Sequence, residues 1–269
     1  DSAARLQALV SPFVLRRVKE DVVADLPEKI EDTVMAQLTG EQRKLYLANQ
    51  DRIAQQVQHR EASEFKKDKL KVLAELTKLR QICCDPRLHY EDYKAGSAKL
   101  DTCMELVHGA LDGGHRILLF SQFTGMLDII GKRLAKEDIA FLKLTGASSK
   151  ESRAKMVAQF QAGEVPVFLI SLKAGGVGLN LTAADVVIHY DPWWNVAAQD
   201  QATDRAHRIG QQHTVTVYKL IAKDTIEERI MQMQESKRDL VNSVLGGDGI
   251  SSALFTREDV LALLGGDGR

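Results

Sequence analysis

From residue 96 onward, short apolar segments alternate with helical ones, and this alternation constrains the fold more than any other feature. Each apolar segment is hydrophobic nearly throughout, as expected for a strand that is buried on both faces. Because a helical pattern separates each strand from the next, we expect an α/β fold: a parallel sheet with helices on both faces. The predicted strands are 116–121, 140–144, 165–171, 185–190 and 214–220, and the predicted helices are 98–111, 123–136, 148–161 and 196–208.

The loops after four of these strands are candidate binding sites, because ligands of parallel sheets bind beyond the carboxyl ends of the strands. Small and hydroxyl-bearing residues in these loops leave backbone N–H groups that can bind phosphate. Glycines in the segment SLKAGGVGLN would let a ligand approach the backbone closely. A tight turn from strand to helix would explain the same glycines. The residues are Ser121 and Gln122, Thr145 and Gly146, and Ser171, Gly175, Gly176 and Gly178.

The loop after the predicted strand 185–190 reads DPWWN and contains both tryptophans of the chain. Pro192 is expected to end the strand, and Asn195 is a suitable N-cap for the helix that follows. A tryptophan is costly to expose to water. We therefore expect one of the pair to lie in the core and the other to form a stacking or wedge surface.

The segment QATDRAHRIGQ at 201–211 contains Gln201, Arg205 and Arg208 at spacing i, i+4, i+7. If 196–208 is one helix, these three side chains project from one face. Two guanidiniums on one face favour an anion, and a phosphate fits their planar, bidentate donors. The alternative is structural: arginines in a last turn complement the helix dipole, and Asp204 with Arg208 is an ordinary i, i+4 ion pair.

The remainder of the chain is predicted to be mainly helical. Residues 29–39 alternate as one strand, and 41–84 form a charged helical hairpin that ends at Asp85 and Pro86. Residues 224–245 form a long amphipathic helix, followed by a short helix at 257–264. In the long helix we expect Glu227, Glu228 and Arg229 to face outward and Ile226, Ile230, Met233 and Leu240 to form an apolar seam.

Composition excludes several classes of protein. The net charge of −1 argues against a general basic nucleic-acid coat, so any nucleic-acid contact must come from a few positioned groups. Three cysteines, Cys83, Cys84 and Cys103, fit neither a disulfide framework nor a common zinc spacing, which indicates an intracellular, reducing compartment. No segment is apolar enough to span a bilayer, and residues 1–9 lack the charged and apolar regions of a signal peptide, so we expect neither feature. The chain starts without a methionine, so we expect a piece of a longer protein.

These segments resemble, in order and at matching spacing, the second (C-terminal) motor lobe of the Swi/Snf-type ATPases, a branch of the superfamily 2 helicase-like enzymes. The resemblance covers residue 12 to about residue 245. It implies a RecA-like lobe with an inserted helical protrusion. The segments that carry it are PFVLRRVKEDVVADLPEKIE, LRQICCDPRL, GSAKL, ILLFSQFTGMLDII, ISLKAGGVGLNLTAADVVIHYDPWWN, QATDRAHRIGQ and KLIAKDTIEERIMQMQESKRDL.

The resemblance also implies roles for individual residues. Arg205 and Arg208 match the paired arginines that reach the γ-phosphate of ATP held by the other lobe, and Gln201 helps to frame that site. Trp194 matches a tryptophan that touches the DNA groove, which leaves Trp193 for the core. Val196 stands where the family more often has proline. The DNA-gripping positions are matched by Ser121, Gln122, Thr145, Gly146, Ser171, Lys173 and Gly175, and we expect Gly176, Gly178 and Asp204 on the nucleotide side.

The sequence lacks the other half of an ATP site. Hydrolysis in this class needs a G-x-x-x-x-G-K-S/T loop and a strand-end Asp-Glu pair for magnesium, and neither is present. Gly131 and Lys132 form the one Gly-Lys step, in the middle of a predicted helix. We therefore expect ATP with Mg²⁺ to be held mainly by an N-terminal lobe, no metal site in this chain, and no ATP turnover by this chain alone.

Residues 1–40 are expected to be an entry segment, 41–95 the protrusion, 96–222 the RecA-like lobe and 223–269 helices that brace it against the other lobe. The expected partners are double-stranded DNA and the N-terminal motor lobe of the same protein. We expect a monomer with no membrane contact, in the cytoplasm or nucleoid of a prokaryote or the nucleus of a eukaryote. One alternative is a non-catalytic nucleic-acid or protein-binding module derived from such a lobe. Another, an RNA helicase lobe, is disfavoured by the LPEK, DPWWN and AHRIGQ segments.

Overall fold

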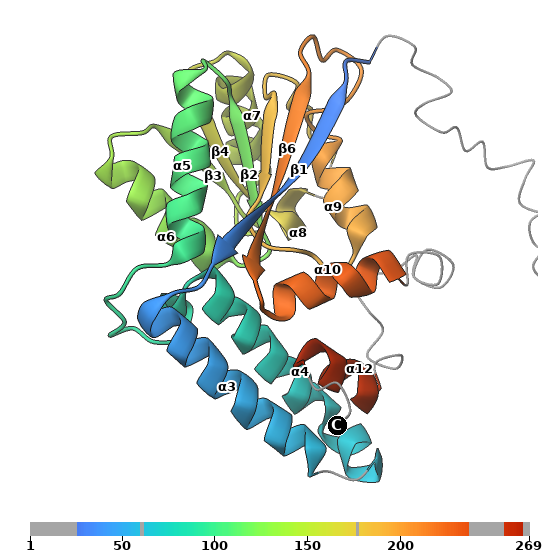
Figure 1. Cartoon of the computed structure of the whole chain (residues 1–269). Coiled ribbons are helices and arrows are strands. Elements are labelled where there is room, and N and C mark those ends of the chain that lie inside the picture. Colours follow the sequence, from blue (N-terminus) through green and yellow to red (C-terminus); the bar gives the residue numbers. More distant parts are fainter. Residues whose placement is uncertain (1–25, 60–61, 176–177, 237–255, 266–269) are drawn as a thin grey trace, which may run out of the picture.

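The protein is described by a computed structural model that covers residues 26–59, 62–175, 178–236 and 256–265. At its centre lies a six-stranded, entirely parallel sheet with the strand order β1-β6-β5-β2-β4-β3 (Figure 1). The predicted fold class is therefore confirmed. The strands are β1 (Lys29–Gln37), β2 (Ile117–Ser121), β3 (Phe141–Leu144), β4 (Val167–Ser171), β5 (Val186–His189) and β6 (Val215–Lys223).

Side-chain alternation along the strands divides the sheet into two packed faces. Ile117 and Leu119 of β2 point into a core with helices α5 (Ala98–Asp112) and α6 (Thr124–Lys136). Leu118 and Phe120 point into the opposite core. That second core is covered by α7 (Lys150–Gln161), α8 (Leu172–Gly175) and α9 (Val196–Thr203). Because both faces are covered, β2, β4 and β5 are buried along their whole length, which explains their uninterrupted apolar sequences.

A separate helical unit adjoins the end of the sheet toward which the strand arrows point (Figure 1). It consists of α3 (Gly40–Gln58) and α4 (Ala62–Cys84), joined by α10 (Ile226–Ser236) and α12 (Arg257–Leu263), around a core that includes Tyr46, Leu76 and Ile230. The predicted helical hairpin is confirmed, and it ends where Asp85 caps the short 3-10 helix η1 (Pro86–Leu88) by accepting a hydrogen bond from the Arg87 backbone N–H. Among the described helices, none has the length and apolarity needed to cross a bilayer.

The C-terminal helices differ from the prediction in one charged residue. Ile226 and Ile230 of α10 are buried as expected, but Glu227 is fully buried and forms an ion pair with Lys99 of α5, so the prediction that it faces outward was wrong. The helical pattern did not reveal this, because the partner cation is 128 residues away in the chain. Residues 237–255, which include Leu240, lie outside the described residues. The described part of α10 packs on β6, α4 and α12 of this chain.

Helix α9 is shorter than predicted. It ends at Thr203, and residues 204–211 form a series of turns, so Gln201, Arg205 and Arg208 do not share one helical face. Beyond the end of the helix, the backbone oxygen of Arg205 accepts a hydrogen bond of 3.0 Å from the N–H of Leu181, which ties the turn to the loop before β5. Ala206 is fully buried at this point, which draws the chain into the core.

Candidate functional site

Arg205 lies in the turn after α9 and is a buried cation that has no carboxylate partner among the described residues. Arg205 is only 8% exposed, and its Nε atom has no hydrogen-bond partner. Burial lowers the pKa of the guanidinium, the positive charge of nearby Arg208 lowers it further, and the negative charge of Asp204 opposes both effects. No ion pair of Arg205 is found in the described part of the chain. A guanidinium in this state is suited to an anion that comes from outside the chain.

Arg208 and Gln201 are exposed on either side of Arg205 in the sequence. The Nη1 atom of Arg208 lies 3.5 Å from the carbonyl oxygen of Leu179, at the end of the glycine-rich loop. Arg208 is close enough to Arg205 for its charge to affect the pKa of Arg205. The turn, and not a helix face, therefore brings the two arginines together.

Gln211 closes this turn, and the sequence analysis gave it no role. Its amide nitrogen donates to the carbonyls of Thr182, Ala184 and Ala206, at 3.2, 2.8 and 3.1 Å. Its amide oxygen accepts from the backbone N–H groups of the next two residues, both at 2.9 Å. Gln211 thus fixes the arginine-bearing turn to the loop before β5. In the sequence, the only sign of this role was a polar residue at the end of the motif. Such a residue could equally bind a ligand or hold a turn by hydrogen bonds.

The glycine-rich loop after β4 is partly described. Ser171 is 2% exposed, and its hydroxyl accepts a hydrogen bond from the N–H of Ala174 at the start of α8. Arg153 of α7 donates to the carbonyl of Ala174 at 2.9 Å and holds α8 in place. Gly178 is exposed with φ of +27°, a conformation that L side chains rarely adopt. Gly176 lies outside the described residues, as do the side chain of Lys173 and the surroundings of Gly175.

Loops at the carboxyl ends of β2 and β5 are joined by one buried carboxylate. Asp191 accepts from the Ser121 hydroxyl and from the Gln122 side-chain amide, both at 2.5 Å. Ser121 is fully buried and also accepts from the N–H of Phe123. The hydroxyls of Ser121 and Ser171 are therefore engaged inside the protein. After β3, Thr145 is half-buried and Gly146 is exposed.

The two tryptophans occupy different surroundings. Trp193 packs against the core under α7, α8 and α9, and Trp194 packs against the core of the helical unit. Both are half-buried, so neither belongs to the fully buried core. Asn195 caps α9 as predicted, because its side-chain oxygen accepts from the N–H of Ala198 at 3.3 Å.

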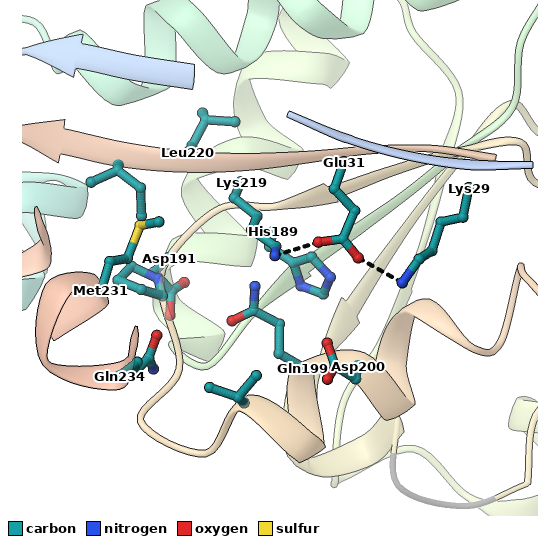
Figure 2. Close-up of a pocket in the computed structure, with 13 residues that line it drawn as sticks. Lys29, Glu31, His189, Asp191, Gln199, Asp200, Lys219, Leu220, Met231 and Gln234 are labelled. Atoms are coloured by element: carbon teal, nitrogen blue, oxygen red, sulfur yellow. Dashed lines mark hydrogen bonds and ion pairs between the residues drawn. The ribbon is translucent and has the colours of Figure 1, made fainter. Parts of the chain in front are cut away.

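A polar cavity of about 220 Å³ lies beside these loops, between β6, α9 and α10 (Figure 2). On its wall, Glu31 contacts Lys29 and Lys219, each at 2.6 Å. Burial raises the pKa of Glu31, but the two lysines outweigh burial and lower it to about 2. His189 is 1% exposed, and burial followed by the charge of Lys219 lowers its pKa to about 3, so it is neutral. The sequence analysis did not predict this cavity.

In the described residues, no three His, Cys, Asp or Glu side chains are grouped so that they could hold a metal ion. The groups that could hold an anionic cofactor are Arg205 and Arg208. Lys132 lies within α6, as predicted, and so is not part of a phosphate-binding loop.

Two family models match the chain. The model described as "Helicase conserved C-terminal domain" matches residues 98–210, and the model described as "SNF2-related domain" matches residues 1–88. Their joint span includes every strand of the sheet except β6, the turn with the two arginines and much of the helical unit.

The chain is also similar to whole proteins and to solved structures. An uncharacterized ATP-dependent helicase of Mycoplasma pneumoniae is 40% identical over 260 residues, which are 96% of this chain and 25% of that protein. The Sulfolobus solfataricus SWI2/SNF2 ATPase core in complex with dsDNA has a TM-score of 0.74 at 36% identity, covering 97% of this chain and 55% of that one. The SWI2/SNF2 ATPase C-terminal domain from the same organism has a TM-score of 0.72 at 32% identity, covering 88% and 98%. The chain thus spans about a quarter of the length of such full relatives.

Proposed function

The chain belongs to the SWI2/SNF2 family of helicase-like ATPases, and on that basis we propose that it is the C-terminal motor lobe of an ATP-dependent translocase or remodeller of double-stranded DNA. In this proposal Arg205 and Arg208 bind the γ-phosphate of ATP that an N-terminal lobe holds with Mg²⁺. Residues 96–222 act as the motor lobe, 41–95 as the protrusion and 223–269 as the brace. The lobe acts as a monomer inside the cell, in the nucleoid of a prokaryote or the nucleus of a eukaryote.

One observation carries this proposal: Arg205 is buried and has no carboxylate partner among the described residues. A buried cation without a counter-charge is unfavourable, so it is expected where an anion joins it during function. Arg208 beside it adds a second, exposed fork of donors. The pair fits a terminal phosphate, which has several oxygens and a high negative charge.

When ATP is bound, its γ-phosphoryl group supplies the reacting phosphorus. The residues of this chain bind this group and orient it. Arg205 and Arg208 stabilise the negative charge that grows on the phosphate oxygens, while Gln201 frames the site from α9. We also assign Gly178 and Asp204 to the nucleotide side, together with Gly176, which lies outside the described residues. Gln211 keeps the turn rigid, which is needed because a small displacement of an arginine finger lowers the rate greatly.

The DNA backbone is proposed to contact the carboxyl-end loops. Gly146 is exposed and Thr145 is half-buried, and with the half-buried Gln122 and Trp194 they would form this surface. Lys173 and Gly175 are assigned to it by the family resemblance alone. Ser121 and Ser171 are buried, so they would act by fixing loops and not by touching phosphate. Contacts of this kind ignore the base sequence and weaken as salt rises. The similarity to a SWI2/SNF2 ATPase core in complex with dsDNA supports a duplex ligand.

Both sets of groups lie in loops and turns that are anchored to one sheet, which is why ATP and DNA binding would be coupled. Closure of the lobes around ATP moves the carboxyl-end loops together with Arg205, and opening after hydrolysis releases them. The brace in this scheme would use the surface of 223–269 that does not face the core of Ile226 and Ile230.

The test is Arg208→Ala in a protein that joins this chain to its N-terminal lobe. Hydrolysis should fall by about 10³-fold or more, the scale of an arginine finger, while duplex affinity stays nearly unchanged. Equal loss of both would identify Arg208 as a DNA ligand. The chain alone should hydrolyse no ATP. If the joined protein also hydrolyses none but binds duplex DNA, the chain is instead a non-catalytic binding module.

A further inference from the structure

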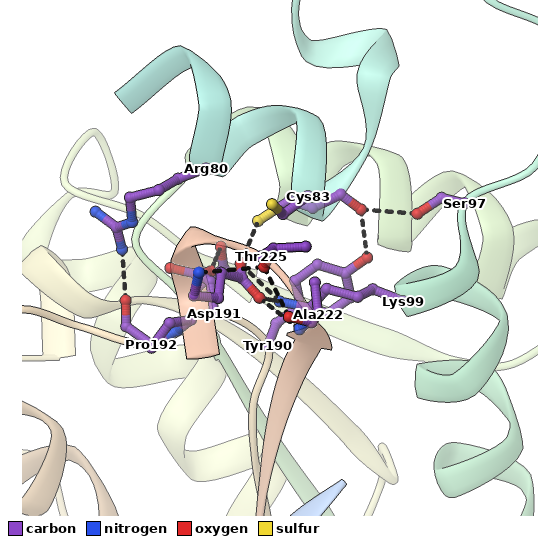
Figure 3. A network of polar contacts seen from close by, with 12 residues as sticks. Arg80, Cys83, Ser97, Lys99, Tyr190, Asp191, Pro192, Ala222 and Thr225 are labelled. Carbon is purple, nitrogen blue, oxygen red and sulfur yellow. Dashed lines mark hydrogen bonds and ion pairs between the residues drawn. The ribbon is translucent and has the colours of Figure 1, made fainter. Parts of the chain in front are cut away.

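Arg80, in α4 of the helical unit, is a second buried arginine, and its contacts reach both carboxyl-end loops. It is 2% exposed. Its Nη1 donates to the side-chain oxygen of Gln122, which follows β2, at 3.1 Å. Its Nη2 donates to the carbonyl of Pro192, which follows β5, at 2.5 Å (Figure 3). Two atoms of one side chain therefore connect α4 to two loops that are 70 residues apart.

The same guanidinium lies against two aromatic rings. Its central carbon is 5.3 Å from the ring centroid of Trp194 and 5.7 Å from that of Phe123. Both distances are within the range of a cation–π contact, which becomes stronger when the cation is shielded from water. Arg80 therefore covers one face of the half-buried Trp194 ring.

Packing alone does not explain an arginine here. Among the described residues no carboxylate forms an ion pair with Arg80, and its Nε has no hydrogen-bond partner. An apolar side chain would fill the space without burying a charge. A planar, forked donor that also stacks on aromatic rings is needed to hold two loops and a tryptophan at once, and neither lysine nor an apolar residue can do so.

We infer that Arg80 is a positioning residue for DNA binding: it fixes Trp194 and the loop after β5 in the orientation that contacts the duplex, and it transmits the position of the helical unit to that loop. This inference rests on the proposed function, in which Trp194 contacts DNA. Asp191 supports the arrangement from the other side, because it accepts from the same Gln122 side chain that Arg80 contacts.

The first test reads Trp194 directly. Trp193→Phe leaves Trp194 as the only tryptophan of the chain, so its fluorescence reports on this loop. In that background Arg80→Lys and Arg80→Gln should each increase quenching by iodide, because the ring loses its cover. Arg52→Gln is the matched control: Arg52 lies in the same helical unit, but its partner is Glu75, so quenching should not change.

The second test measures affinity for a short fluorescein-labelled DNA duplex. Arg80→Lys should weaken binding by about tenfold, which is the scale of one base or backbone contact made by an aromatic side chain. Trp194→Phe should weaken binding similarly. The two substitutions combined should weaken it no further than Trp194→Phe alone, because Arg80 acts through the tryptophan.

The outcomes separate this inference from the function on which it rests. If the unsubstituted chain binds no duplex, the proposed function fails and the inference fails with it. If the chain binds duplex but Arg80→Lys changes neither quenching nor affinity, or if its effect adds fully to that of Trp194→Phe, only the inference is overturned. Loss of helical circular dichroism in both Arg80 variants would also overturn it, because Arg80 would then be required for the fold.

Discussion

Two buried cations of this molecule, Lys99 and Arg205, have opposite electrostatic surroundings. Lys99 of α5 is fully buried, and its ammonium contacts both carboxylate oxygens of Glu227, at 2.8 and 3.0 Å, and the ring of Tyr190 (Figure 3). Burial lowers the pKa of Lys99, but the charge and hydrogen bonds of Glu227, together with the nearby Cys84 and Asp191, outweigh burial and raise it. For Arg205 burial is reinforced by Arg208, and the pKa is lowered.

The difference separates a charge that serves the fold from one that serves a ligand. Lys99 and Glu227 neutralise each other, and Glu227 also accepts from the N–H of Ala222, so α5, β6 and α10 are tied together by groups that are all satisfied. Arg205 has no comparable partner in the described part of the chain. Removing a partner of Lys99 should therefore cost stability, whereas removing Arg205 should cost activity.

The largest effect is expected for Arg205→Met in the protein that joins this chain to its N-terminal lobe. Hydrolysis of ATP should fall by about 10³-fold or more, as for loss of an arginine finger. The free energy of unfolding of the chain should change by less than about 1 kcal/mol, because an unpaired buried charge adds no stability. Steady-state hydrolysis and urea unfolding measure the two quantities.

The matched control is Arg116→Met, at the other end of β2, where the side chain contacts the carbonyl of Phe160. The rate of ATP hydrolysis by this variant should be unchanged. A large loss of stability in Arg205→Met would show that Arg205 has a partner within the protein, and the contrast with Lys99 would not hold.

The next effect is on stability. Glu227→Gln removes the charge that balances Lys99 and should lower the free energy of unfolding by about 3 kcal/mol, as for a buried ion pair that loses one partner. Replacing both residues, with Lys99→Met and Glu227→Leu, should recover most of this loss because no charge is then left buried. Urea unfolding followed by circular dichroism measures both variants. A loss below about 1 kcal/mol in the single variant would mean that Glu227 does not neutralise Lys99.

A smaller effect is expected for Gln211→Ala, which tests how the arginine turn is held. The substitution leaves buried carbonyls without donors, and each such group costs about 1–3 kcal/mol when it stays unsatisfied. Because the turn can relax toward water, we expect a loss of about 2 kcal/mol in urea unfolding. The neighbouring exposed residue supplies the control: Gln212→Ala should change stability by less than about 0.5 kcal/mol. Equal losses in the two variants would show that the hydrogen bonds of Gln211 do not hold the turn.

The sheet could be predicted from the sequence because its information is local. Strands β2, β4 and β5 are buried on both faces, so their residues are apolar in unbroken runs, and the predicted bounds differ from the observed ones by one or two residues. The cap of α9 by Asn195 was also predictable, because a cap acts within one turn of its own helix.

The features that the sequence did not reveal depend on partners far along the chain. After the early end of α9, the turn is held by the Arg205 carbonyl, which accepts from the N–H of Leu181 in a loop that precedes β5. Glu227 can be buried because it forms an ion pair with Lys99. The contacts of Arg80 and Gln211 likewise exist only after the sheet has formed. Residue type alone was enough to single out Arg205 and Arg208 as a pair. The helix face that was expected to carry them does not exist, because α9 ends at Thr203.

The smallest effect concerns another buried basic residue, His189, which is neutral because it has lost its proton. Burial, followed by the charge of Lys219, lowers its pKa from 6.5 to about 3, whereas Glu31 opposes this shift. Its other neighbours, Phe120 and the Thr203 hydroxyl, are neutral. Because the unfolded chain binds a proton near pH 6.5 and the folded protein does not, stability is complete above that pH and is lost as the pH falls below it.

Between about pH 7 and pH 5.5 the loss from His189 should be about 1 kcal/mol in urea unfolding. His189→Gln should remove most of this slope. Glu31 does not interfere, because its pKa of about 2 makes its own contribution fall only as the pH drops below 4.5. The pKa of His89 is also lowered by burial, and His89→Gln is the control, with a smaller change because that residue is exposed. If the pH dependence of unfolding is unchanged in His189→Gln, His189 must be protonated in the folded protein. It would then be a buried cation without a counter-charge, as Arg205 is among the described residues.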